Sequence, residues 1–275
     1  AHLFESGDRN KAASYFAISG RRRFRTGQLE ASVHDFLQAL DLANLQSREP
    51  HELLQWLKEL HAAVHRVRSA PAAADILARV LDRIDAAGSL PEQIHARICG
   101  AATLGGTHQF DTALLYLEQA LQLASSAQSL QSLVHLTMAE LLMRQGYFSR
   151  ALTSLQRIQS PSELDREDVY RMQVIAAHVQ GATGNRRSGL DHLEIATELA
   201  DPADLAAAVE REKIRGLILH FNRDFRAAAS AFERGVDLAR EAGLSFEVAL
   251  ALHNMGDSLV WLDNLARAHV AFRES

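Results

Sequence analysis

An internal repeat of about forty residues limits most strongly how this chain can fold. In each copy a small residue, replaced by His61 in the second and weaker copy, is followed twelve positions later by a second small residue. A bulky apolar residue follows four positions later, and another small or β-branched residue three positions after that. The second small position recurs at Ser32, Ala73, Ala113, Ala151, Gly189, Ala228 and Ala268. Such a period is typical of stacked supersecondary units that bury a continuous core between neighbours.

The spacing within one copy indicates two antiparallel helices. A small residue within one helix and another near the start of the next let the helices approach closely, and the bulky residue one turn later fills the groove beside them. Glycine in a helix costs about 1 kcal/mol relative to alanine. Its recurrence at Gly20, Gly216 and Gly256 therefore indicates a packing requirement.

Turn residues and prolines predict where these helices begin and end. The predicted first helices cover residues 11–25, 50–66, 91–104, 129–145, 166–182, 204–220 and 246–261. The predicted second helices cover residues 28–45, 70–87, 109–127, 147–159, 186–200, 225–242 and 264–275. The seven units then span 11–45, 50–87, 91–127, 129–159, 166–200, 204–242 and 246–275, and residues 1–6 are predicted to end an earlier helix.

Composition supports an all-α fold and excludes several classes of protein. The chain has 275 residues, 47% of them hydrophobic and only 6% aromatic, with 5 prolines, which disfavours a β-sandwich. The net charge of −5 gives no basic field, so direct nucleic-acid binding is not predicted. Charged residues or histidines interrupt every apolar run, so no membrane span is predicted.

The single cysteine, Cys99, cannot form an internal disulfide, which suits a reducing compartment and a cytoplasmic location. The chain starts and stops in the middle of the repeat pattern. We therefore expect residues 1–275 to be a single repeat array cut from a longer protein.

Helix pairs with this spacing resemble tetratricopeptide repeats, which usually run 34 residues. The longer unit is similar to the MalT-like variety, found in the sensor regions of bacterial transcriptional activators and signalling ATPases. The opening segment Ala1–Asp8, the following Lys11–Phe16 and the late segment Ala251–Asp257 carry this similarity. The resemblance implies a right-handed superhelical solenoid of about seven helix pairs, whose first helices line a concave surface that binds a protein or ligand.

On that resemblance, side chains near the small residue of each first helix would point into the concave surface. The candidate binding residues are Arg21, Gln55, Lys58, His95, Glu140, Arg171, His178, Glu210, Lys213, His253 and Asp257. Their mixed charge differs from the Lys/Asn-rich clamp of chaperone-binding tetratricopeptide proteins. A preference for a C-terminal carboxylate is therefore not predicted.

Catalytic and cofactor motifs are weak throughout. No phosphate-binding Gly-x-x-x-x-Gly-Lys-Ser/Thr loop is present, and the glycine-rich segment 181–185 is predicted to be a repeat turn. His61 and His65 could share one helix face as zinc ligands, but no further ligand motif accompanies them. Cys99 has His95 four residues away, yet it lies in an apolar helix and is predicted to be a core residue. We predict no enzyme activity, no cofactor and no metal.

Two further features allow two interpretations each. The basic run 21–25 ends a predicted helix, where cations complement the helix dipole, but it could also meet an acidic partner. Trp56 and Trp261 lie on predicted first helices. Packing between repeats is favoured for both tryptophans over a role as a peptide anchor.

These observations predict a non-catalytic interaction or sensor module of a multidomain bacterial signalling protein. It would recognise a protein, a peptide or another domain of its own chain, with a small-molecule effector as a further option. Binding would regulate an attached ATPase, kinase or transcription-factor domain. The alternative is a stand-alone scaffold or adaptor.

Overall fold

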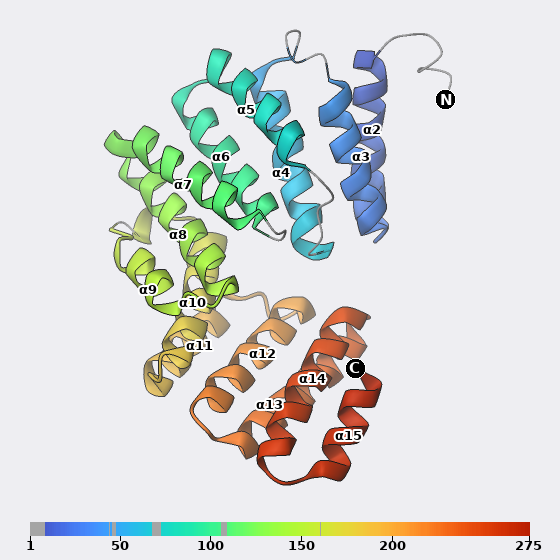
Figure 1. Cartoon of the computed structure of the whole chain (residues 1–275), viewed down its shortest axis with the longest axis vertical. Coiled ribbons are helices and arrows are strands. Elements are labelled where there is room, and N and C mark those ends of the chain that lie inside the picture. The colour runs from blue at the N-terminus through green and yellow to red at the C-terminus, as the bar shows by residue number, and fades with distance from the viewer. Residues whose placement is uncertain (1–8, 44, 46–47, 68–72, 106–108, 160) are drawn as a thin grey trace. The chain divides into compact units, whose positions relative to one another are not determined.

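The computed structural model describes residues 9–43, 45, 48–67, 73–105, 109–159 and 161–275. Over these residues the chain forms fourteen α-helices and no β-strand (Figure 1). The predicted all-α fold class is therefore confirmed. The predicted helix end at residues 1–6 lies outside the described residues, as do residues 68–72, where the helix predicted over 70–87 would begin, and residues 106–108.

The helices alternate as the repeat predicts, with a first and a second helix in each repeat. The first helices are α2 (Arg9–Arg25), α4 (Pro50–Val67), α6 (Leu90–Leu104), α8 (Gln128–Arg144), α10 (Arg166–Ala182), α12 (Leu205–Phe221) and α14 (Ser245–Trp261). The second helices are α3 (Leu29–Leu42), α5 (Ala74–Ala87), α7 (Phe110–Leu123), α9 (Phe148–Gln156), α11 (Arg186–Leu199), α13 (Phe225–Glu241) and α15 (Leu265–Glu274).

The chain divides into two compact units, an N-terminal unit (Ala1–Leu141) and a C-terminal unit (Leu142–Ser275). Within each unit a second helix packs against its own first helix and against the next first helix, as α3 does with α2 and α4, and α13 with α12 and α14. Successive first helices also touch, as in α2 with α4 and α12 with α14. This is the packing of a helical-repeat array.

The recurrent glycines on the first helices lie where an aromatic ring of the second helix approaches the backbone. A Cβ added at Gly20 would lie 3.1 Å from the Phe36 ring, and one added at Gly216 would lie closer still to Phe232. Gly20 and Gly216 are both buried. The packing requirement inferred from the sequence is thus explained by one ring seated on each glycine.

In the five turns between paired helices that the structure describes, a left-handed residue lies five positions before the second small position. Glycine fills this place at Gly27, Gly146 and Gly184, with φ between 76° and 90°. Arg223 and Asp263 fill it in the last two repeats, with φ of 62° and 57°. Because L-residues rarely adopt positive φ, these two turns carry a local energetic cost.

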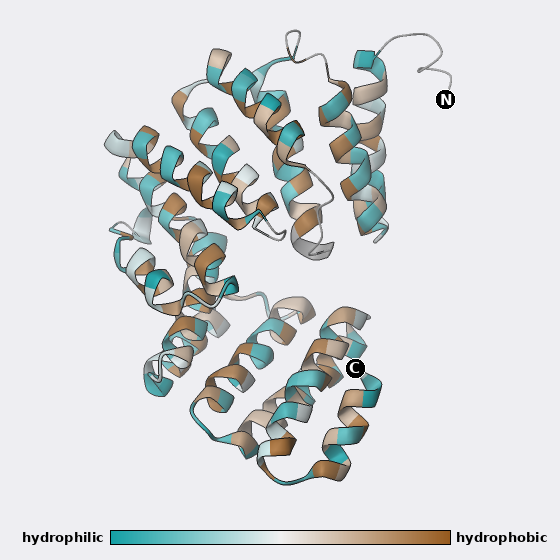
Figure 2. Ribbon diagram, in the orientation of Figure 1, coloured by the Kyte–Doolittle hydropathy of each residue, from teal (hydrophilic) through white to brown (hydrophobic). Residues whose placement is uncertain are grey.

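Each helix carries an apolar and a polar side, so both ends of the hydropathy scale appear along most of the helices in Figure 2. In the N-terminal unit one continuous core runs from Ala12 to Leu141. A buried polar contact also joins a helix pair there, because Ser32 Oγ donates to the Gly20 carbonyl at 2.9 Å. No described helix is both long enough and apolar enough to cross a bilayer.

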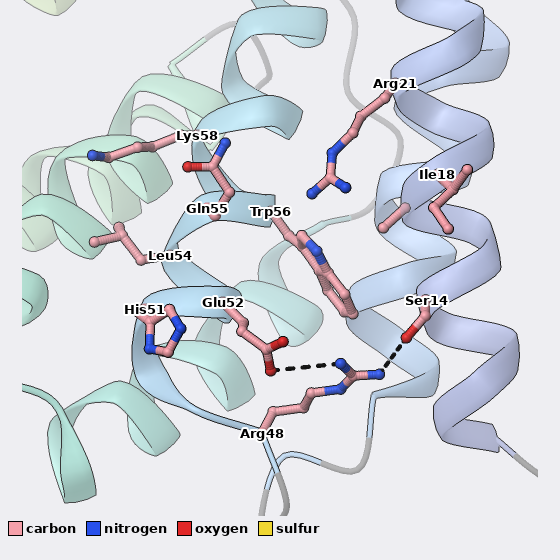
Figure 3. A pocket seen from close by; sticks show the side chains of 11 residues that line it. Ser14, Ile18, Arg21, Arg48, His51, Glu52, Leu54, Gln55, Trp56 and Lys58 are labelled. Atoms are coloured by element: carbon pink, nitrogen blue, oxygen red, sulfur yellow. Dashed lines mark hydrogen bonds and ion pairs between the residues drawn. The ribbon is translucent and has the colours of Figure 1, made fainter.

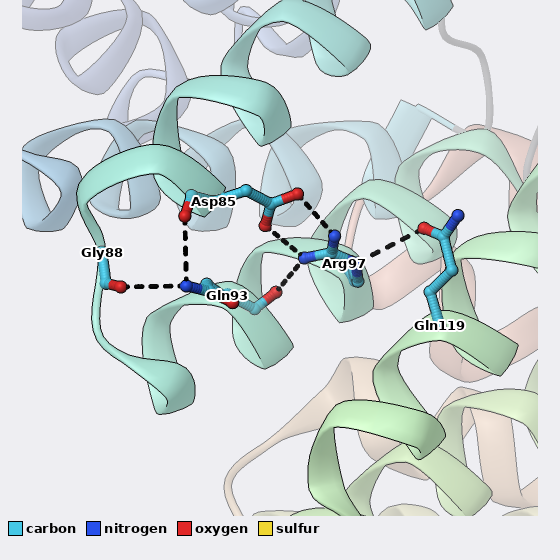
Figure 4. Close-up of polar contacts among 5 residues, drawn as sticks. All are labelled: Asp85, Gly88, Gln93, Arg97 and Gln119. Carbon is cyan, nitrogen blue, oxygen red and sulfur yellow. Dashed lines mark hydrogen bonds and ion pairs between the residues drawn. The ribbon is translucent and has the colours of Figure 1, made fainter.

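Arg97 on α6 links three consecutive helices of the N-terminal unit (Figure 4). Its two Nη groups donate to both oxygens of Asp85 on α5 at 2.6 Å, and its Nε donates to Gln119 Oε1 on α7 at 3.4 Å. The Arg97 side chain is only 11% exposed. A bidentate, largely buried guanidinium of this kind fixes the register of neighbouring helices.

Candidate functional site

Two cavities lie along α2 and α4 in the N-terminal unit, and together they are called here the α2–α4 groove. The larger cavity, of about 530 Å³, is lined by Ser14, Ala17, Ile18, Arg21, Arg48, His51, Glu52, Leu54, Gln55, Trp56 and Lys58 (Figure 3). The smaller cavity, of about 200 Å³, is lined by Arg21, Phe24, Arg25, Phe36, Glu59 and Ala62. Arg21 lines both cavities.

Helical periodicity places these side chains on facing stripes. Ser14, Ile18 and Arg21 follow i, i+4, i+7 spacing on α2, and positions 51, 55 and 58 do the same on α4. Residues with this spacing share one face of a helix. Three predicted binding residues, Arg21, Gln55 and Lys58, therefore meet in one cavity.

Trp56 contributes to the wall of the larger cavity and is only 5% exposed. The Arg48 guanidinium carbon lies 5.0 Å from the centre of its ring, a cation–π contact. Arg48 also donates to Ser14 Oγ at 2.6 Å and to the Asn10 carbonyl at 2.9 Å, and it lies 3.5 Å from Glu52 (Figure 3). Trp56 and Arg48 thus brace α4 against α2, which is the packing role predicted for the tryptophan.

The other cations of the groove differ in whether they form ion pairs or hydrogen bonds with neighbouring residues. Arg21 Nε donates to Glu59 Oε1 at 2.8 Å, and Gln55 Nε2 donates to the same oxygen at 2.9 Å. Lys58 and Arg25 are exposed, and neither forms a hydrogen bond or ion pair with any residue the structure describes. The groove therefore presents two unpaired cations on either side of a bonded one.

The rest of the basic run has structural partners. Arg23 Nη1 lies 3.1 Å from Asp35 Oδ1, and Asp35 is 2% exposed. Arg22, Arg23 and Arg25 all lie in the last turn of α2, where the helix dipole favours cations. The positions of these arginines agree with the helix-dipole interpretation, and an acidic partner for this run stays a prediction.

First-helix charges in the C-terminal unit mostly contact one another. Lys213 Nζ on α12 lies 3.2 Å from Glu247 Oε2 on α14, with the two side chains 14% and 20% exposed. The Tyr170 hydroxyl on α10 lies 3.5 Å from Glu210 Oε2 on α12. Burial, followed by the charge of Glu210, raises the pKa of Tyr170 to about 12. Its hydroxyl therefore stays protonated and able to donate at neutral pH.

His178 on α10 lies among aromatic rings. Its ring centre is 5.7 Å from that of Phe148 and 6.4 Å from that of Phe221, with which it stacks at 18°. Burial, followed by the positive charge of Lys213, lowers the pKa of His178 to about 4. His178 is therefore a neutral packing residue at pH 7.

The remaining predicted residues are not gathered into one site. Arg171 bonds Asp168 on its own helix at 2.7 Å. His253 and Asp257 are exposed neighbours on α14, 3.8 Å apart, and His95 Nδ1 lies 2.8 Å from the Pro91 carbonyl. Glu140 is partly buried on α8.

Sequence reasoning missed a row of rings formed where the first helices α12 and α14 end and the second helix α13 begins. Phe225 stacks on Trp261 with ring centres 5.3 Å apart and an interplanar angle of 9°, and His220 packs edge-on against Phe225 at 5.3 Å. Trp261 is nevertheless 68% exposed. It packs between repeats, as predicted, and still leaves most of its surface uncovered.

Sequence reasoning also missed the groove residues Arg48 and Ile18. A usable signal was present, because polar contacts recur about one repeat apart along the chain. Arg21 with Glu59 and Arg186 with Asp224 are 38 residues apart, and Lys213 with Glu247 are 34 apart. Searching for complementary polar residues at that separation would have paired Arg48 with Ser14.

No cluster of three metal-binding side chains occurs in the described parts of the chain. The His61–His65 pair cannot be placed as a site, because the side chain of His65 lies outside the described residues. Cys99 is buried, as predicted for a core residue.

Comparison with known proteins identifies the fold. No protein-family model matches the chain, and no curated protein matches it. Solved structures do. A Rap protein complexed with competence and sporulation factor shares 13% identity, with a TM-score of 0.66 over 95% of this chain and 73% of that one.

Two other solved structures are similar. Aspartyl phosphate phosphatase F from Bacillus subtilis shares 11% identity, with a TM-score of 0.67 over 96% of this chain and 69% of that one. A signal transduction ATPase with a tetratricopeptide repeat sensor, from Pyrococcus horikoshii, shares 13% identity, with a TM-score of 0.60 over 88% of this chain and 38% of that one. The chain therefore has a tetratricopeptide-like helical-repeat fold.

Proposed function

We propose that this chain is a non-catalytic recognition module that binds a partner protein or peptide in the α2–α4 groove. The observation that carries the proposal is a cavity of about 530 Å³ between consecutive first helices, with the unpaired cation Lys58 and the exposed apolar side chain of Ile18 at its edge. A volume of this size is typical of ligand pockets. It accommodates a few side chains of a bound segment.

The groove is braced before any partner arrives. The Arg48 contacts to Trp56 and Ser14 and the Arg21–Glu59 ion pair hold α2 and α4 together. A preformed site avoids part of the entropy cost of ordering on binding. Exposed Ile18 and Lys58 then supply apolar and charged contacts to the partner.

Names of structural neighbours support recognition as the function. One neighbour was solved in complex with competence and sporulation factor, and another is a signal transduction ATPase with a tetratricopeptide repeat sensor. By analogy, we propose that this module senses its partner within a cytoplasmic, multidomain bacterial signalling protein and regulates an attached ATPase, kinase or transcription-factor domain. Regulation requires that the partner bind one state of that protein more tightly than the other.

A peptide array tests the binding function. The 275-residue chain is labelled and applied to a large set of immobilised peptides of diverse sequence, together with two variants. Ile18→Glu places a charge in the groove, and Ile195→Glu places the same charge on an exposed position of α11. We expect peptides that bind the unmodified chain and Ile195→Glu but not Ile18→Glu. Binding that survives Ile18→Glu, or no binding by any peptide, would contradict the proposal.

A further inference from the structure

Resting on the recognition function proposed above, we infer that the α2–α4 groove selects an acidic peptide segment in which an acidic side chain neighbours an apolar one. The charges of the groove and the different walls of its two cavities support this selectivity.

Positive charge dominates the groove although the whole chain is acidic. The linings contain four cations, Arg21, Arg25, Arg48 and Lys58, and two carboxylates, Glu52 and Glu59. The net charge of the chain is −5. A local excess of positive charge on an acidic protein steers acidic partners to this surface and disfavours basic ones.

The donor groups that the cations of the larger cavity have left over after their own bonds set where an acidic side chain would bind. Arg48 is bonded to α2, and the Nε of Arg21 is bonded to Glu59. The amino groups of the Arg21 guanidinium point toward Trp56 across the larger cavity, as Figure 3 shows. Arg21 can therefore donate to a carboxylate seated beside Trp56. Exposed Lys58 points away from Arg21 in the same view and adds positive charge at the edge of the cavity.

The smaller cavity has a different character. Phe24, Phe36 and Ala62 form its apolar walls, and exposed Arg25 lies at its edge. Its volume of about 200 Å³ suits a single apolar side chain. Because Arg21 lines both cavities, occupants of the two are neighbours, as adjacent side chains of one peptide are.

The two carboxylates of the groove limit how acidic the segment can be. Glu59 already neutralises part of Arg21, and Glu52 lies beside Arg48. A continuous run of acidic residues would bring like charges against these groups. The groove therefore favours acidic residues alternating with apolar ones over a purely acidic run.

Fluorescence anisotropy with four labelled, capped nonapeptides tests this selectivity on the 275-residue chain. The first alternates glutamate and leucine, the second lysine and leucine, the third glutamate and serine, and the fourth contains glutamate alone. We expect the glutamate–leucine peptide to bind at least about tenfold more tightly than each of the others. Equal or tighter binding of the lysine–leucine or glutamate-only peptide would overturn the inference.

A charge-reversal pair locates the binding. The double variant Arg25→Glu with Lys58→Glu reverses both unpaired cations of the groove, while Arg226→Glu with Arg273→Glu reverses two exposed cations of the C-terminal unit. We expect the first to weaken binding of the glutamate–leucine peptide about tenfold or more, and the second to change it less than about twofold. Circular dichroism checks that both variants fold. Equal weakening by the two variants would overturn the inference.

The peptide array separates this inference from the proposed function. If groove-dependent peptides emerge that are neutral or basic, the acidic selectivity is wrong and recognition by the groove stands. If no peptide of any composition binds, both fail.

Discussion

Equivalent repeat positions have different surroundings in the two units of the molecule. Lys58 and Lys213 each lie three residues before the first small position of their repeat, yet Lys58 is exposed without a described partner and Lys213 is paired with Glu247. Arg21 and His178 each follow the small position directly. Arg21 lines two cavities, whereas His178 packs among Phe148 and Phe221.

The comparison shows that a residue's position in the repeat determines its place on the helix but not its contacts. The position fixes the helix and the face on which a side chain lies. Its role depends on which residues the neighbouring repeats supply. Lys213 and His178 in the C-terminal unit contact neighbouring helices. In the N-terminal unit, Arg21 bonds Glu59 and also lines the groove, and Lys58 pairs with no described residue.

The largest expected effect concerns His178. Its pKa of about 4 lies below its ordinary value of 6.5, so the unfolded chain binds the proton more tightly than the folded one. The stability this contributes is present above pH 6.5 and is lost as the pH falls toward 4, by about 2–3 kcal/mol. Hydrogen exchange of α10 and α12 amides as a function of pH measures the loss. His178→Phe should remove most of this dependence of stability on pH. Arg21→Gln should leave the dependence unchanged, since arginine does not titrate in this pH range. An unchanged slope in His178→Phe would contradict the packing role.

Alanine substitutions at the first-helix glycines are expected to give the next largest change in the free energy of unfolding. Gly216→Ala forces a methyl group against the fully buried Phe232 ring, and should lower the free energy of unfolding by about 1–2 kcal/mol despite the better helix propensity of alanine. Gly20→Ala meets Phe36 at 3.1 Å, so the propensity gain of about 1 kcal/mol should roughly cancel the crowding. Urea unfolding of both variants measures the difference. Equal effects would show that the two helix pairs are packed alike.

Substitutions of the two equivalent lysines, Lys58 and Lys213, are expected to change the free energy of unfolding by a smaller amount. Lys213→Met removes the cation that lies 3.2 Å from the partly buried Glu247 and should cost about 1 kcal/mol of stability. Lys58→Met, at the equivalent position, should change stability by less than about 0.5 kcal/mol. Thermal unfolding of both variants tests this contrast, and a larger cost at Lys58 would show that it has a structural role.

Glycine substitution at a left-handed turn position is expected to give the smallest change in stability. Arg223 occupies a left-handed position that glycine fills at Gly27, so Arg223→Gly should raise stability by about 0.5 kcal/mol. Arg226→Gly, three residues later and within α13, should instead lower it by about 1 kcal/mol. Chemical denaturation measures both, and a loss at Arg223 would show that its side chain stabilises the turn.

The sequence was sufficient to predict the helices, because the repeat spacing and the turn residues give the same boundaries. The predicted helix over 166–182 begins at Arg166 and ends at Ala182, and that over 246–261 agrees within one residue. The second helix predicted over 147–159 is shorter, ending at Gln156. Helix existence follows from local periodicity, which the sequence carries directly.

The groove was only partly predictable. Repeat positions predicted Arg21, Gln55 and Lys58. Arg48, by contrast, lies in a connection between two repeats, and its side chain bonds Ser14 in the preceding repeat. The two tryptophans could not be distinguished either, although Trp56 is 5% exposed and Trp261 is 68% exposed. Such differences depend on contacts a whole repeat away, which single-helix patterns do not contain.

Hydrogen–deuterium exchange of the 275-residue chain, with and without the glutamate–leucine nonapeptide, tests the central claim most directly. If the α2–α4 groove is the recognition site, the peptide should slow exchange in α2 and α4 and leave α10, α12 and α14 unchanged. No protection in α2 and α4, or protection confined to the first helices of the C-terminal unit, would contradict the account.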